Sequence, residues 1–284
     1  MTTDRNNLAA SNKPSALVDP IWQQLRAEAE LAADAEPALA SAISAGILRQ
    51  TSLEAAVANR VGERLRTQIV ALGMEPEALR QAFKQMATEE REWSIVLRAD
   101  LAAVFDRDPA CDRYLEPVFY FKGFQALQAH RLAHWLWNSG RRDFALAIQS
   151  VVSTVFQVDI HPAVPVGRGI FMDHATGIVV GSTARLGDNV SILQGVTLGG
   201  TGKEEGDRHP KVSSGVLIGA GAQVLGNIEI GHCSRVGAGS VVLASVPPMK
   251  TVAGVPAKII GEAGCAEPGR SMDHMLLPLG APEF

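Results

Sequence analysis

The feature that most constrains the fold is a six-residue period that begins at residue 180. An aliphatic residue occupies every sixth position, with one charged interruption after Leu198, at Val180, Leu186, Ile192, Leu198, Val212, Ile218, Val224, Ile230, Val236 and Val242. Glycine directly follows six of these residues, which marks tight corners. A period of six does not fit a helix with 3.6 residues per turn. It does fit a parallel β-helix that has three six-residue faces and an aliphatic interior.

A second hexad series precedes this one, at Ile160, Val166, Met172 and Ile178, but it is out of step with the later positions by two residues. We expect a register slip between Thr176 and Val179 to reconcile the two series. The slip falls beside Asp173 and His174, in the otherwise largely apolar segment FMDHATGIVVG. A break in the coil that carries a carboxylate and an imidazole is a candidate functional site.

Up to about residue 155 the sequence predicts helices instead. Asp19-Pro20 and Glu75-Pro76 place a proline at a first helical position, where its missing N–H costs nothing. The stretch 51–54, TSLE, is a capping-box pattern. Aliphatic residues then recur at intervals of four, at Leu53, Val57, Val61 and Leu65. This stripe indicates a helix with one buried face, packed among several others.

The helical and the six-residue periods define two domains, and the two ends of the chain lie outside them. We predict a disordered N-terminal extension over residues 1–18, an α-helical domain over 19–155, a parallel β-helix over 156–260 and a flexible C-terminal tail over 261–284. The predicted fold class is therefore α+β, with the helices and the coil segregated along the chain.

Composition excludes several kinds of function. The net charge of -4 and the pI of about 6.0 give no basic face for nucleic acid. The N-terminal sequence is polar, and the apolar runs are shorter than the ~20 residues of a membrane span, so we expect a cytoplasmic protein without membrane contact.

Cys111, Cys233 and Cys265 are too far apart for a zinc motif or a disulfide framework. His130 and His134 lack the glutamate of H-E-x-x-H, so we interpret them as packing or surface residues and expect no metal.

Several segments of the hexad region, VDIHP, DHATGIVVG, SILQGVTLGGTGK, GDRHPK and TVAGVPAKI, resemble those of serine acetyltransferases. The resemblance extends back through DRDPACDRYLEPVFYFKGFQALQAHRLAHWLW in the helical half. It implies a left-handed coil and the transfer of acetyl from acetyl-CoA to the hydroxyl of L-serine, which gives O-acetyl-L-serine and CoA as the first step of cysteine biosynthesis. It also implies a homo-oligomer: active sites between subunits require a trimer at minimum, and the family pairs trimers through the helical domain into a hexamer.

The chemistry of the residues agrees with this activity. An alcohol is a poor nucleophile at neutral pH, so acyl transfer to it needs a base. His174 suits that role, because an imidazole with an ordinary pKa of about 6.5 is largely neutral near pH 7. Asp159 precedes it by fifteen residues, and a coil of eighteen would place the two on neighbouring levels, where the carboxylate can accept the second ring N–H. The resemblance assigns the same aspartate to that task.

Serine is a zwitterion and needs partners for both of its charges. Arg208 can form a bidentate pair with the substrate carboxylate, and His209 can donate a hydrogen bond to it. Asp173, and by resemblance Asp108, are placed to hold the ammonium. The interruption from 200 to 211 would be a loop that carries Arg208 and His209 over the site. L-cysteine should satisfy the same contacts and inhibit the enzyme.

Coenzyme A has few sequence signatures. The resemblance implies backbone contacts at Gly200, Ala220 and Ala238, and a backbone N–H near Gly200 could stabilise the oxyanion. Further candidates for the phosphate end are Arg235, Thr251 and Lys258. Many members of the family also dock onto cysteine synthase through a C-terminal isoleucine. Since this chain ends in Phe284, we expect such docking to be weak or absent.

Other interpretations stay open at this point. Asp173 could cap a turn, and Arg208 with Lys211 could belong to a solvated loop. A related acetyltransferase could act on a sugar or another amino acid, although the charges of Arg208, Asp108 and Asp173 disfavour a neutral sugar. A γ-type carbonic anhydrase would need three zinc-binding histidines, and the hexad region offers only dispersed ones, at His161, His174, His209 and His232. A non-catalytic scaffold is the third alternative.

Overall fold

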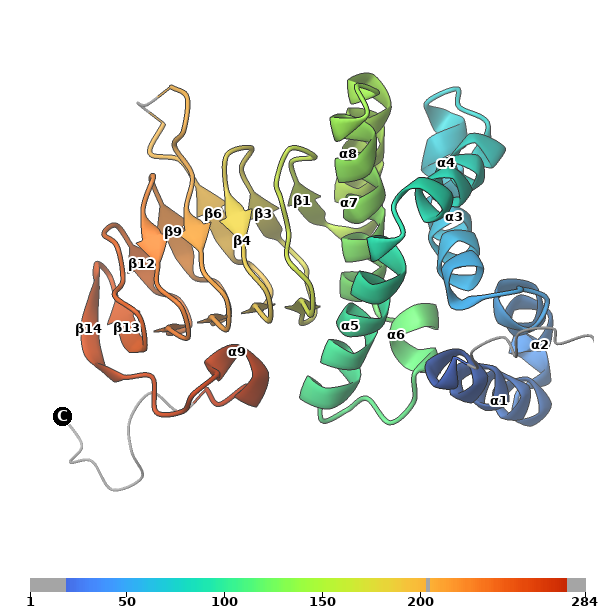
Figure 1. Cartoon of the computed structure of the whole chain (residues 1–284), viewed down its shortest axis with the longest axis horizontal. Helices are drawn as coiled ribbons and strands as arrows, with labels where there is room; N and C mark the ends of the chain where they lie inside the picture. Colours follow the sequence, from blue (N-terminus) through green and yellow to red (C-terminus); the bar gives the residue numbers. More distant parts are fainter. Residues whose placement is uncertain (1–18, 203–204, 275–284) are drawn as a thin grey trace, which may run out of the picture.

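The structure is a computed structural model that describes residues 19–202 and 205–274. The predicted N-terminal extension, 1–18, and the last part of the predicted tail, 275–284, lie outside the described residues. Helices occupy one end of the molecule and a prism of short strands the other (Figure 1). No helix among the described residues has the length and apolar character needed to cross a bilayer.

The helical layer includes helices that begin at the three start signals of the sequence, at Pro20, Leu53 and Pro76. Its elements are α1 (Pro20–Ala35), α2 (Pro37–Ile43), the π-helix η1 (Ser44–Leu48), α3 (Leu53–Ala71), α4 (Pro76–Glu89), α5 (Glu92–Arg107), α6 (Leu115–Phe119), α7 (Lys122–Asn138) and α8 (Arg142–Phe156). Asp19 caps α1 by accepting the N–H of Trp22 at 3.3 Å. The expected stripe on α3 is fully or almost fully buried, which confirms the amphipathic helix.

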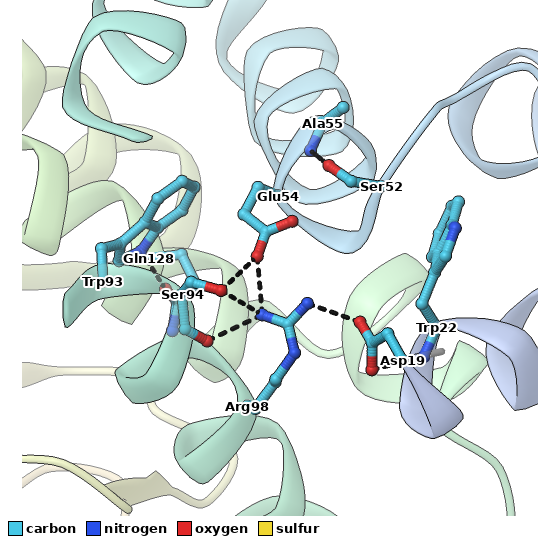
Figure 2. Close-up of polar contacts among 9 residues, drawn as sticks. All are labelled: Asp19, Trp22, Ser52, Glu54, Ala55, Trp93, Ser94, Arg98 and Gln128. Atoms are coloured by element: carbon cyan, nitrogen blue, oxygen red, sulfur yellow. Dashed lines mark hydrogen bonds and ion pairs between the residues drawn. The ribbon is translucent and has the colours of Figure 1, made fainter. Parts of the chain in front are cut away.

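The expected capping box at α3 is different in detail. Ser52, not Thr51, is the cap, and its hydroxyl accepts the N–H of Ala55 at 3.2 Å. Glu54 turns away from the helix end toward Arg98, which lies 2.6 Å away on α5 (Figure 2). Burial alone would raise the pKa of Glu54, but hydrogen bonds from Arg98 and Ser94 hold it below its ordinary value. The carboxylate of Glu54 therefore forms an ion pair with the partly buried guanidinium of Arg98 and does not cap the start of α3.

A buried ion pair joins the helices to the coil. Asp100 on α5 is completely buried and accepts hydrogen bonds from Nε and Nη2 of Arg131 at 2.7 and 2.9 Å. Asp100 also accepts the backbone N–H of Ile170 at 3.1 Å, just before the second strand of the coil. Arg131 donates onward to the carbonyls of Val166 and Gly167. The helical layer and the coil therefore share a buried polar anchor and one continuous hydrophobic core.

The coil consists of short parallel strands on three faces. The strands are β1 (Val158–Ile160), β2 (Phe171–Met172), β3 (Ile178–Val180), β4 (Arg185–Leu186), β5 (Ser191–Ile192), β6 (Thr197–Gly199), β7 (Lys211–Val212), β8 (Leu217–Ile218), β9 (Gln223–Leu225), β10 (Glu229–Ile230), β11 (Arg235–Val236) and β12 (Val241–Val242). Face A contains β1, β3, β6, β9 and β12, face B contains β4, β7 and β10, and face C contains β2, β5, β8 and β11. All ten predicted hexad residues are at most 4% exposed, which confirms the aliphatic interior.

The register slip is also confirmed. Ile160 lies opposite Val180, twenty residues on, whereas Val180 lies opposite Leu198, eighteen residues on. The two extra residues fall in the turn 173–177 between β2 and β3. His174 and Ala175 adopt left-handed backbone conformations there, with φ of 53° and 60°. The break in the coil is therefore a wider turn, slightly earlier than expected.

The C-terminal segment folds back onto the coil. Face C continues into β13 (Lys250–Gly254), which pairs antiparallel with β14 (Ala257–Glu262). The short α9 (Pro268–Ser271) then packs against β8 on the side of the coil toward α5 (Figure 1). Gly269 fits there because a Cβ would lie 2.3 Å from the carbonyl oxygen of Asn189. Residues 261–274, which we expected to begin a flexible tail, thus contain a strand end and a docked helix.

Candidate active site

Two corners of the prism carry the predicted site residues. We call the turns that lead from face C to face A corner CA; they include 173–177, 193–196, 219–222 and 237–240. The turns that lead from face A to face B form corner AB; they include 181–184 and 200–210, the predicted loop. Asp173 and His174 lie on corner CA, and Arg208 and His209 lie on corner AB.

A cavity of about 800 Å³ opens at corner CA. It brings together Asp108, Asp173 and His174, as expected. Asp108 directly follows α5, and its carboxylate accepts the N–H of Ala110 at 2.9 Å. The first turn of α7 supports the other two, because Gly123 packs so closely that a Cβ there would lie 2.1 Å from the carbonyl oxygen of Met172. The cavity therefore forms between the coil and the helical layer.

The electrostatics of the cavity suit a cationic group beside a base. Nε2 of His174 lies 3.8 Å from Oδ1 of Asp173, and the imidazole is 75% exposed. Burial raises the pKa of Asp173, the nearby imidazole of His174 opposes the rise, and the like charge of Asp108 adds to it. Two carboxylates in one cavity gain from a ligand ammonium between them.

Asp159 does not meet His174 within the described chain. Its carboxylate accepts a hydrogen bond from Nε2 of Gln149 at 2.6 Å, on the outside of face A. The residue opposite Asp159 is Val179, because the first coil has twenty residues instead of eighteen. His174 consequently lies five residues before that position, on the corner.

Arg208 and His209 are held at corner AB. His209 is 6% exposed, and its ring lies on Gly181, where a Cβ would be 2.0 Å from Nε2. Burial lowers the pKa of His209, and the charges of Arg208 and Lys211 lower it further. The stem of Arg208 packs against Gly200, where a Cβ would lie 3.3 Å from its Cδ. His209 is therefore a neutral hydrogen-bonding group beside an exposed cation.

The candidates for coenzyme A binding divide between corners and strands. Ala220 and Ala238 lie on corner CA, on adjacent levels, where the N–H of Gly239 donates to the carbonyl of Ala220 at 2.8 Å. Gly200 lies on corner AB, and Lys258 is exposed on β14. Arg235 and Thr251 are buried and hold the C-terminal segment.

The contacts of these two residues are with their own chain. Thr251 donates to the carbonyl of Glu262 at 2.8 Å, and Arg235 pairs with Asp273 at 3.6 Å and bonds the carbonyl of Ala263. His130 and His134 likewise contact backbone carbonyls, of Val164 and Pro162, as expected of packing residues. No three histidine, cysteine or acidic side chains of the described residues are grouped as a metal site.

Sequence reasoning missed several residues near the site. Lys122, at the start of α7, lines the cavity and bonds the hydroxyl of Thr176. Met272 and His274 reach the cavity from the C-terminal segment. Thr183 bonds the loop at corner AB. Periodicity cannot reveal such residues, because tertiary packing brings them to the site.

A helical domain on a hexad coil, with a histidine and two aspartates in a cavity at one corner, is typical of a hexapeptide-repeat transferase. Residues 209–244 match the family described as bacterial transferase hexapeptide (six repeats). Residues 21–129 match the family described as serine acetyltransferase, N-terminal.

Comparisons with individual proteins point to one family within this class. The chain is 50% identical over 261 residues to the serine acetyltransferase of Salmonella typhimurium, covering 92% of this chain and 94% of the relative. The crystal structure of serine acetyltransferase from Brucella abortus in complex with coenzyme A is similar with a TM-score of 0.84 and 58% identity, over 88% of this chain and 98% of that one. A serine acetyltransferase in complex with cysteine gives a TM-score of 0.86 at 46% identity, over 90% and 98% of the two chains.

The chain belongs to the serine acetyltransferase family. This confirms the predicted α+β class, with a helical domain and a left-handed parallel β-helix. It also sets aside the carbonic anhydrase and scaffold interpretations.

Proposed function

We propose that this chain transfers the acetyl group of acetyl-CoA to the hydroxyl of L-serine, with His174 as the base. The observation that carries the proposal is the cavity where His174 converges with Asp108 and Asp173, in a chain of this family. His174 takes the hydroxyl proton as the serine oxygen attacks the thioester carbonyl. The new C–O bond forms, the C–S bond breaks, and the proton passes from His174 to the departing thiolate. The products are O-acetyl-L-serine and CoA.

Serine binding uses both corners in this proposal. Asp108 and Asp173 hold the ammonium, and Arg208 with His209 hold the carboxylate. Within one chain these pairs lie at opposite edges of face A, whose three-residue strands span about 10 Å. The active sites between subunits that the resemblance implies would bring corner CA of one copy to corner AB of another around a single serine molecule. This favours a trimer, and the paired trimers expected from the resemblance belong to the same proposal.

Coenzyme A would run along corner CA, away from His174. The backbone at Ala220 and Ala238 forms a continuous edge there. Gly200, presented by corner AB of the neighbouring copy, would offer its N–H to the oxyanion. We assign the phosphate end to Lys258, since Arg235 and Thr251 are engaged with their own chain.

For Asp159 we retain the role that the resemblance implies, as a partner for the second ring N–H of His174. Its carboxylate would have to exchange Gln149 for the imidazole when substrates bind. L-cysteine would occupy the serine site and inhibit. The cytoplasmic location expected from the sequence is likewise kept as a proposal.

The direct test measures thiol release from acetyl-CoA with serine, homoserine, threonine and a sugar as acceptors. We expect serine to be preferred, and His174→Ala to lose most of kcat while the assembly seen by light scattering stays intact. Wild-type turnover in an assembled His174→Ala protein would overturn the role of the base. Preference for the sugar would overturn the choice of substrate.

A further inference from the structure

Thr183, on corner AB, directs every one of its polar groups at the segment that carries Arg208 and His209. Its hydroxyl oxygen accepts the backbone N–H of Arg208 at 3.0 Å and that of His209 at 3.1 Å. The same oxygen lies 2.7 Å from Nδ1 of His209, and the backbone N–H of Thr183 donates to Nδ1 at 3.2 Å. Its carbonyl accepts Nζ of Lys211 at 2.9 Å. Thr183 is thus an attachment point of the loop on the coil.

These contacts use the full capacity of one hydroxyl. A hydroxyl has one proton to donate and two lone pairs that accept. Here the two backbone N–H groups occupy the lone pairs, and the hydroxyl proton faces Nδ1 of His209 and the carboxylate of Asp207, which also hydrogen-bonds this hydroxyl. Since Nδ1 accepts the backbone N–H of Thr183, the ring proton of the neutral imidazole is on Nε2. Thr183 therefore fixes both the place of the ring and the nitrogen that donates.

Lys211 adds a second set of contacts at this point, because its Nζ also donates to the carbonyl of His209 at 2.7 Å and pairs with Asp207. Arg208 is exposed, and Gly202 and Gly206 adopt left-handed conformations in the same loop. Ordering such a segment only when the substrate binds would consume binding free energy, whereas a preformed arrangement does not.

We infer that Thr183 is a positioning residue for serine recognition, which presets the backbone of Arg208 and the imidazole of His209 for the substrate carboxylate. The inference rests on the proposed function, in which these two residues bind that carboxylate. Thr183 touches neither substrate itself. Its effect should therefore appear in the affinity for serine and pass through its two neighbours.

The test compares Thr183→Val, which keeps the shape but loses the hydroxyl, with Thr183→Ser, which keeps the hydroxyl. We expect Thr183→Val to raise KM for serine at least about tenfold, the factor that corresponds to about 1.4 kcal/mol. KM for acetyl-CoA should change less than about twofold, and Thr183→Ser should restore most of the serine affinity. Thr88→Val is the matched control, because that hydroxyl bonds only the carbonyl of Lys84 within α4.

A double-mutant cycle separates positioning from general stability. If Thr183 acts through its neighbours, combining Thr183→Val with Arg208→Lys should cost less than the sum of the single losses. Unchanged serine dependence in Thr183→Val, or fully additive losses, would overturn the inference while Arg208→Lys still weakens serine binding. If Arg208→Lys itself leaves serine binding unchanged, the proposed carboxylate site fails and the inference falls with it.

Discussion

Replacing Gly181 by alanine should disable serine binding through a single steric contact. The backbone of Gly181 is outside the left-handed region, so alanine is tolerated there. The added Cβ would lie 2.0 Å from Nε2 and 2.1 Å from Cδ2 of His209. Ordinary contacts between such atoms lie at about 3.5 Å, so the ring must move by about 1.5 Å. A displacement of about 1 Å in a binding group can cost about 100-fold in rate, which is the loss we expect in kcat/KM for serine.

Steady-state kinetics with each substrate varied in turn would measure this loss. KM for acetyl-CoA should be little changed in Gly181→Ala, because corner CA is untouched. In a His209→Ala background the clash disappears, so the double variant should match His209→Ala alone. Wild-type serine kinetics in Gly181→Ala would refute the reasoning, and so would losses that simply add.

Three further predictions concern other parts of the molecule. Asp100→Asn leaves Arg131 as a buried unpaired charge, so the free energy of unfolding should fall by about 3–5 kcal/mol in urea titrations. Because burial and Asp108 hold the pKa of Asp173 above its ordinary value, its carboxylate is protonated, and the ammonium site lost, at a higher pH than for an exposed aspartate. KM for serine should therefore rise early on acidification, and Asp108→Asn should shift that rise to lower pH. A synthetic peptide of residues 275–284 should show no micromolar binding to the cysteine synthase of the same organism by calorimetry.

The fold was predictable where one local rule repeats. The ten hexad residues, the register slip and the α3 stripe each follow from periodicity alone, because an inward position must be apolar whatever its neighbours are. The cap of α3 and the docking of α9 were not predictable in this way. Glu54 accepts a hydrogen bond from Arg98, forty-four residues away, and α9 can pack only because Gly269 lies against the carbonyl of Asn189. Neither partner is visible in the local sequence.

The grouping of the candidate site residues was predictable in part. Asp173 and His174 stand out as polar residues at a break, and the resemblance supplied Asp108, which shares their cavity. The pairing of Asp159 with His174 rested on an eighteen-residue coil. The two extra residues of the turn place Val179 opposite Asp159, and His174 lies five residues earlier, on the corner. The break that singles out His174 therefore changes the spacing on which the pairing was argued, and the pairing itself stays a prediction.

The two interruptions of the hexad pattern have a common physical meaning. Each inward hexad residue is buried in the core, and each tight turn is too short to present side chains that could bind a substrate. His174 lies in the wider turn at 173–177 and lines the cavity. Arg208 and His209 lie in the loop 200–210, at the other edge of face A. In the proposed function, a site divided between two edges of one face is completed by a second copy of the chain, so both departures from the hexad pattern would serve the same intersubunit site.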